Sequence, residues 1–185
     1  KHSTESIRFI TLDGRYAYVQ KRQGVLGLVS SFRSVDFISE HSQSDFIIKD
    51  SRFKQRLAIE IIPNEQKEFN LIKNHKIVVV DWGKTQTREV GFGRVSKLHL
   101  EDEWISFYNP LEKVISLKNI LTQRQYQIKI SSKTSPYFFP EVEMISADTV
   151  VYTDTNEKGY IALIQYNLVT QKSNVLYKSS QNGTR

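Results

Sequence analysis

The sequence predicts an all-β fold made of repeated antiparallel sheets, and three observations lead to this prediction. The segment 7–20 has the pattern of a tight hairpin, a similar pattern returns further along the chain, and no segment has a convincing helical periodicity. The hairpin is the strongest of the three. Asp13-Gly14 stands between two apolar runs, and the glycine supplies the positive φ that a two-residue turn requires.

The hairpin pattern recurs at a regular interval. An aspartate precedes an apolar strand at Asp13, Asp102 and Asp148, and these positions fit a period of about 45 residues with one copy missing. The best match for the missing copy is 74–81, although it lies out of phase. A period of this length with several short strands per copy is typical of propeller blades. We therefore expect a β-propeller or partial propeller of about four four-stranded antiparallel blades.

The expected blades cover 6–45, 46–95, 96–140 and 141–178, within a single domain over 1–185. The first contains strands at 7–11, 16–20, 25–29 and 35–39. The second contains strands at 46–49, 69–72, 76–82 and 87–92, together with an ambiguous segment at 52–62. In that segment Leu57 and Ile61 fit a helix face, but the alternation of Leu57, Ile59 and Ile61, followed by Pro63, favours a strand.

The third and fourth blades have clearer strand patterns. Strands are expected at 96–100, 104–108, 114–117 and 124–130, and then at 142–146, 149–153, 160–168 and 173–177. The segment 124–130 alternates most regularly, with Tyr126, Ile128 and Ile130 on one face and polar side chains on the other. One face of that strand is therefore expected to contact water, as in an outer strand of a blade.

The first repeat resembles the blade repeat of TolB-type β-propellers. The resemblance lies in Phe9, Asp13-Gly14-Arg15 and Ala17-Tyr18, followed by a further apolar strand, and the layout of 144–177 is similar. It implies a periplasmic or cell-envelope setting. A blade repeat is a structural plan and carries no chemistry with it.

Composition excludes several classes of site. The absence of cysteine excludes disulfides, thiolate metal sites and cysteine catalysis. No stretch approaches the roughly 20 apolar residues of a membrane helix. The formal net charge is +6, but the basic residues are scattered, so weak attraction to polyanions is the most that the charge indicates.

One loop is the main candidate for a binding surface. Tyr137, Phe138 and Phe139 lie between Pro136 and Pro140, and rigidly held aromatic side chains are frequent in protein interfaces. The alternative is that these rings pack into the next blade.

The region around the second aspartate marker supplies two further candidates, His99 and Asp102. His99 precedes the acidic run 101–103, so a carboxylate could orient its imidazole, and Asp102 could contact a basic partner. The alternatives are a structural histidine and a solvated turn.

No metal site, cofactor site or catalytic residue is predicted. The four histidines lie far apart. The segment 154–159 resembles the start of a calcium loop, but Lys158 and Gln165 stand where ligands are needed, which favours a hairpin turn. Neither a nucleophile elbow nor a phosphate-binding loop is present.

The leading functional prediction is a non-catalytic propeller module that presents loops to a protein partner. Four blades are the lower limit for a closed propeller, and the chain begins at Lys1, so the remainder of a larger ring is also an expected partner. One alternative is a carbohydrate-active enzyme, a glycoside hydrolase or lyase, with Asp13, Asp102 and Asp148 around a channel. The other is a module that binds a polyanion or nucleic acid.

Overall fold

The computed structural model describes residues 7–12, 15–22, 25–29, 34–38, 45–49, 56–62, 75–81, 84, 86–130, 138–155 and 160–179. Side chains are described from Arg56 onward, that of Ser96 excepted. Within these residues the chain forms sixteen β-strands and no helix. None of the described residues therefore belongs to a helix long and apolar enough to cross a membrane.

The strands form four antiparallel sheets, each made of four consecutive strands. The first sheet contains β1 (Ile7–Leu12), β2 (Arg15–Arg22), β3 (Val25–Val29) and β4 (Ser34–Ile38). The second contains β5 (Asp45–Lys49), β6 (Arg56–Ile62), β7 (Lys76–Asp81) and β8 (Gln86–Phe92). The third contains β9 (Arg94–His99), β10 (Trp104–Asn109), β11 (Val114–Asn119) and β12 (Gln125–Lys129). The fourth contains β13 (Val142–Ser146), β14 (Thr149–Thr155), β15 (Ile161–Asn167) and β16 (Ser173–Lys178).

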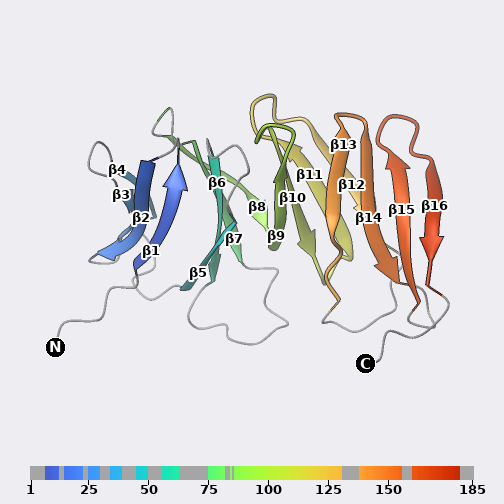
Figure 1. The fold of residues 1–185 in the computed structure, drawn as a ribbon, viewed down its shortest axis with the longest axis horizontal. Coiled ribbons are helices and arrows are strands. Elements are labelled where there is room, and N and C mark those ends of the chain that lie inside the picture. Colours follow the sequence, from blue (N-terminus) through green and yellow to red (C-terminus); the bar gives the residue numbers. More distant parts are fainter. Residues whose placement is uncertain are drawn as a thin grey trace.

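The four sheets stand side by side in chain order, with the first and the fourth at opposite ends of the row (Figure 1). The second, third and fourth sheets meet at their first strands, since β9 contacts β5 on one side and β13 on the other. Blades arranged around an axis have this form. The chain is thus an all-β propeller or partial propeller, and the predicted fold class is confirmed.

The repeat was predicted correctly at two positions and wrongly at one. Asp102 and Asp148 both lie in the turn between the first and second strands of their sheets. The segment 74–81, expected to be the missing copy, instead ends in β7, the third strand of the second sheet. Its valine run is apolar because β7 is a central strand with both neighbours in place, and not because it opens a new repeat. Asp13-Gly14 and the strand predicted at 69–72 lie outside the described residues.

Two other strand predictions are confirmed by burial. The ambiguous segment 52–62 contains β6, whose residues are almost all buried. Along β12 and its extension, Ile128 and Ile130 are buried while Gln125, Gln127 and Lys129 are exposed. The alternation that predicted one wet face therefore holds.

Apolar side chains fill both described boundaries between sheets. Between the second and third sheets the buried cluster consists of Ala58, Ile77, Val79, Val90, Val95, Leu98, Ile105, Phe107 and Ile120. Between the third and fourth sheets it consists of Trp104, Tyr108, Ile115, Leu117, Ile128, Ile130, Val142, Met144, Val150, Tyr152 and Leu168. These clusters hold the sheets face to face and so fix the positions of β9 and β13.

The second and third sheets are joined by a single residue, Gly93. Its φ is 132°, a conformation that side chains disfavour, and a Cβ there would lie 2.6 Å from the carbonyl oxygen of Tyr108. Only glycine lets the chain pass directly from β8 into β9. The sharp turn places Arg94 at the start of β9, beside the segment that precedes β13.

Candidate functional site

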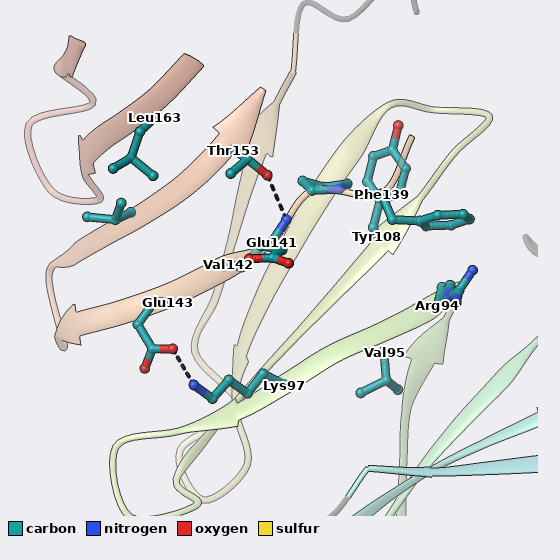
Figure 2. Close-up of a pocket in the computed structure, with 12 residues that line it drawn as sticks. Arg94, Val95, Lys97, Tyr108, Phe139, Glu141, Val142, Glu143, Thr153 and Leu163 are labelled. Carbon is teal, nitrogen blue, oxygen red and sulfur yellow. Dashed lines mark hydrogen bonds and ion pairs between the residues drawn. The ribbon is translucent and has the colours of Figure 1, made fainter. Parts of the chain in front are cut away.

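A cavity of about 480 Å³ lies between the third and fourth sheets, where β9 and β13 approach each other. We call it the recess. Its lining comes from β9, β10, the segment 139–141, β13, β14 and β15 (Figure 2). The lining residues are Arg94, Val95, Lys97, Tyr108, Phe139, Pro140, Glu141, Val142, Glu143, Val151, Thr153 and Leu163. The volume lies within the range of small-ligand and peptide side-chain pockets.

Two aromatic rings and a guanidinium group form one end of the recess. The guanidinium carbon of Arg94 lies 4.0 Å from the centroid of the Phe139 ring, which is a cation–π contact. Tyr108 meets the same ring edge-on, with the centroids 6.1 Å apart and an angle of 87° between the planes. Figure 2 shows Arg94, Phe139 and Tyr108 grouped at this end. Phe139 is therefore held between two partners from the third sheet.

Two carboxylates line the rest of the recess, Glu143 at the end away from Phe139 and Glu141 between the two ends (Figure 2). Glu143 Oε2 forms an ion pair with Lys97 Nζ, which ties β13 to β9 across the boundary. Glu141 donates its backbone N–H to Thr153 Oγ1 at 2.8 Å, so its position is fixed by the main chain while its side chain is exposed. The recess thus contains two cationic and two anionic side chains, and Lys97 and Glu143 form the one ion pair among them that the described part of the chain shows.

His99 lies behind the recess and joins the two sheets. Its Nδ1 accepts a hydrogen bond from the backbone N–H of Met144 at 3.4 Å, and its Nε2 lies 2.8 Å from Ser106 Oγ. Because Nδ1 acts as an acceptor, the network assigns the proton to Nε2, which donates to Ser106. The Ser106 hydroxyl in turn donates to the carbonyl of Lys97 at 3.4 Å. His99 therefore makes these hydrogen bonds in its neutral form.

Burial lowers the pKa of His99 from its ordinary value of 6.5 to about 4. The carboxylate of Glu143, 3.9 Å from Nδ1, opposes this shift, and the ammonium group of Lys97 adds to it. Desolvation outweighs the neighbouring carboxylate because the side chain is fully enclosed. The imidazole is consequently neutral at physiological pH.

Two tyrosines of the boundary have raised pKa values. Burial, and then the carboxylate of Asp154, raise the pKa of Tyr108 above 10. Burial and the same carboxylate raise the pKa of Tyr152 to about 12. Both phenols therefore stay neutral, and the hydroxyl of Tyr108 keeps its proton as a hydrogen-bond donor.

The other boundary contains Asp102, which the sequence singled out. Its carboxylate accepts the backbone N–H of Arg56 at 3.3 Å, and its carbonyl accepts Arg56 Nη1 at 2.9 Å. Arg56 Nε also donates to Asp81 Oδ2 at 3.1 Å. Leu100, Glu101 and Asp102 all have positive φ, between 46° and 66°, which is uncommon for residues other than glycine. The contacts with Arg56 help to hold this left-handed turn in place.

The structure brings some of the predicted site residues together and separates others. Phe139 lines the recess, Phe138 next to it is partly buried, and Tyr137 lies outside the described residues. His99 is buried and does not line the recess, but its Nδ1 lies 3.9 Å from Oε1 of Glu143, which does. Asp102 is buried at the other boundary and does not face the recess.

Sequence reasoning missed Arg94, Lys97, Tyr108, Glu141 and Glu143. One signal was available for the two glutamates, because they alternate with the apolar Val142 and Met144 along the predicted strand 142–146 and therefore point away from its buried face. Among the described residues no group of three histidine, aspartate or glutamate side chains is arranged to hold a metal ion.

Comparisons with known proteins support the fold. No protein-family model and no curated protein matches this sequence. Solved structures do match: a luciferin-regenerating enzyme has 8% sequence identity and a TM-score of 0.53, over 96% of this chain and 63% of that one. The WD40 repeats of RRP9 have 10% identity and a TM-score of 0.51, over 96% and 52%. A chain of a nidogen/laminin complex has 8% identity and a TM-score of 0.51, over 96% and 63%.

This chain therefore spans between about half and somewhat under two thirds of the length of those solved structures. At such low identity the likeness concerns the fold alone. A putative TolB from Agrobacterium tumefaciens is 14% identical with a TM-score of 0.48, over 91% of this chain and 63% of that one, which does not assign the chain to the TolB family. The comparisons therefore support a propeller-like fold.

Proposed function

We propose that this chain is a non-catalytic β-propeller module that binds a protein partner at the recess between its third and fourth sheets. The observation that carries the proposal is the stacking of Arg94 on Phe139 beside Tyr108, inside a concave site. Arginine and aromatic side chains held rigidly in a pocket are the residues that contribute most binding energy in protein interfaces. A similar solved chain comes from a complex of two proteins, nidogen and laminin, which supports this use of the fold.

The proposal is tested by selecting binders from a random peptide library displayed on phage, with the immobilised chain as target. Selected peptides are synthesised, and their affinities are measured for the original chain, for Phe139→Ala and for Leu121→Ala. Leu121 is exposed in the turn between β11 and β12, at the end of the third sheet opposite the recess, and serves as the control.

We expect Phe139→Ala to weaken binding at least about tenfold and Leu121→Ala to leave it within about twofold. Urea unfolding of each variant confirms that the fold is intact. Failure to enrich any peptide, or equal binding to both variants, contradicts the proposal. Retention on heparin that persists to high salt, together with failure to select peptides, favours the polyanion-binding alternative.

A second partner that we propose is a further propeller blade, packed on the outer face of the fourth sheet. This face carries Ile161 and Tyr177, which are 43% and 61% exposed, and Leu163, which lies opposite Tyr177 and also lines the recess, so a blade packed here would cover one wall of the recess. Exposed apolar side chains that lie together on one face often mark an interaction site, and Ile161 and Tyr177 are two such side chains on this face. The greater length of the similar solved propellers agrees with an additional blade.

If this proposal is correct, the isolated chain self-associates through the exposed face, and Ile161→Lys with Tyr177→Ser reduces that association. Sedimentation velocity over a range of concentrations measures it. A chain that stays monomeric at every concentration contradicts an exposed blade-binding face. A cell-envelope location, which rests on the TolB-like repeat of the sequence, forms part of the same proposal and is checked by fractionation of the source cells.

A further inference from the structure

We infer that the recess recognises a carboxylate group carried by a peptide, with Arg94 as the contact and Phe139 and Tyr108 as the platform beneath the neighbouring side chain. The inference rests on the proposed function, because it specifies which peptides the recess takes. Several arginine and lysine side chains surround the recess and the nearby boundary between the second and third sheets.

Most of these cations are already engaged. Lys97 pairs with Glu143, and Arg56 contacts Asp81 and Asp102. The side chains of Arg88 and Lys118 donate to the backbone carbonyls of Ile120 and Val90, respectively. Arg94 differs from all of them, since its guanidinium group makes no hydrogen bond or ion pair with any described residue.

The stacking on Phe139 leaves the donors of Arg94 available. A cation–π contact uses the flat face of the guanidinium group, while its N–H groups lie in the plane and point outward from the edge. Arg94 is also partly buried in the wall of the recess, so these donors face a site of reduced hydration. The stacked Arg94 side chain has already lost much of its conformational freedom. Ligand binding therefore costs less entropy than it would for a mobile arginine.

The shape of the Arg94 guanidinium group determines which chemical group it binds best. A planar fork of N–H donors matches the two oxygens of a carboxylate, in a bidentate arrangement that an ammonium group cannot form. The aromatic rings beside it offer an apolar surface for a side chain next to that carboxylate. Tyr108 packs edge-on against the Phe139 ring and so supports this surface.

The remaining charges exclude polyanions. Glu141 and Glu143 also line the recess, and Glu141 has no ion-pair partner among the described residues. These carboxylates repel a phosphate group or an acidic polymer that carries several negative charges. A ligand with a single carboxylate, held by the fork of Arg94, meets less of this repulsion than a ligand with several negative charges. A basic or amide group further along the same peptide would suit Glu141.

The test compares charge-matched peptides and charge-matched variants. Peptides selected on the original chain are synthesised with each aspartate or glutamate replaced by its amide and with the C-terminus free or amidated. Each form is titrated against the original chain, Arg94→Gln, Arg94→Lys and Arg124→Gln. Arg124 is the control. Its guanidinium carbon lies 4.9 Å from the centroid of the Tyr126 ring, just before β12 at the opposite end of the third sheet. Arg124→Gln therefore removes the same charge and a similar stacking contact outside the recess.

We expect Arg94→Gln to lower the affinity for the acidic peptides at least about tenfold and Arg94→Lys to restore part of that affinity. Arg124→Gln should leave the affinity within about twofold of that of the original chain. Replacing the recognised carboxylate by its amide should weaken binding to the original chain to a similar extent and make no difference to Arg94→Gln. As a small-molecule arm, 3-phenylpropionate should shift the NMR signals of the recess, whereas 3-phenylpropanamide should not.

The outcomes separate this inference from the proposed function. Peptides that need Phe139 but bind equally well to Arg94→Gln, or as amides, overturn the carboxylate assignment and leave protein binding standing. A failure to select any peptide overturns both. Binding of heparin that is lost in Arg94→Gln also overturns the inference, because it would make the recess a polyanion site.

Discussion

The boundary between the second and third sheets is closed by buried charged side chains, whereas the boundary between the third and fourth is closed by a neutral imidazole and contains the recess. At the first boundary Glu60, only 1% exposed, contacts both His75 and the third sheet. At the second boundary His99 holds the fourth sheet. The two boundaries therefore differ in electrostatics as well as in packing.

Both boundaries nevertheless meet the same requirement. The first strand of a sheet has one edge without a neighbouring strand, so its backbone N–H groups need other acceptors. The N–H of Val95 in β9 finds Glu60 Oε2 at 3.3 Å, and the N–H of Met144 in β13 finds His99 Nδ1 at 3.4 Å. The acceptor is a carboxylate oxygen at the first boundary and an imidazole nitrogen at the second, and the imidazole nitrogen can no longer accept once it is protonated.

The largest effect is expected from Glu60→Leu at the first boundary. This change leaves His75 Nδ1 and the N–H of Val95 without their acceptor in a buried site, which should cost about 3–5 kcal/mol of unfolding free energy. Urea unfolding measures the loss. The control is Glu89→Gln on the same sheet, which breaks an exposed pair with Lys76 and should cost less than about 1 kcal/mol. Equal losses would show that the buried pair is not special.

The next effect is a pH dependence at the second boundary. His99 has a pKa of about 4 in the folded protein and 6.5 when unfolded. Between these values the unfolded chain holds a proton that the folded chain does not, so stability is fully present above pH 6.5 and falls as the pH is lowered toward 4. The contribution amounts to about 3 kcal/mol, measured by urea unfolding at several pH values.

His99→Gln supplies the matched variant for this pH prediction. Its amide oxygen can accept the N–H of Met144 and its amide nitrogen can donate to Ser106, but it does not titrate. The variant should therefore lose most of the slope between pH 6.5 and about 4. An unchanged slope would assign the acid sensitivity to other groups.

A third comparison concerns packing. A Cβ at Gly91 would lie 2.8 Å from Cζ of the buried Phe107, so Gly91→Ala should cost about 2 kcal/mol at the tight first boundary. Val151→Ile, which adds a carbon at the wall of the recess, should cost less than about 0.5 kcal/mol. If the clash with the ring is the cause, Gly91→Ala should cost much less in a Phe107→Leu background, as a double-mutant cycle would reveal.

The smallest effect is expected from the ion pair that crosses the second boundary. Lys97 and Glu143 are both about half exposed, at 53% and 50% of their side-chain surface. A double-mutant cycle with Lys97→Gln and Glu143→Gln should give a coupling energy below about 1 kcal/mol, decreasing with salt. A coupling as large as the loss in Glu60→Leu would remove the distinction between the two boundaries.

Local pattern was sufficient to predict the fold class and most of the described strands, but it could not predict the recess. Alternation over 124–130 and the aspartate turns at Asp102 and Asp148 depend on neighbouring residues, and the structure follows them. The contact of Arg94 with Phe139 depends on the packing of two sheets and on the turn at Gly93, which no periodicity encodes. His99 drew attention through its acidic neighbours, yet its partners are Ser106 and Met144.

The most direct test of the difference between the boundaries is amide hydrogen exchange at Val95 and Met144, followed by NMR as the pH is lowered from 6.5 toward about 4 and corrected for intrinsic exchange rates. If the neutral His99 closes the second boundary, the amide of Met144 is protected at the higher pH and acid lowers its protection, whereas His99→Gln removes this pH dependence at Met144 and leaves the exchange of Val95 unchanged. An unprotected Met144 at the higher pH, or the same pH dependence of Met144 in His99→Gln, would contradict the account.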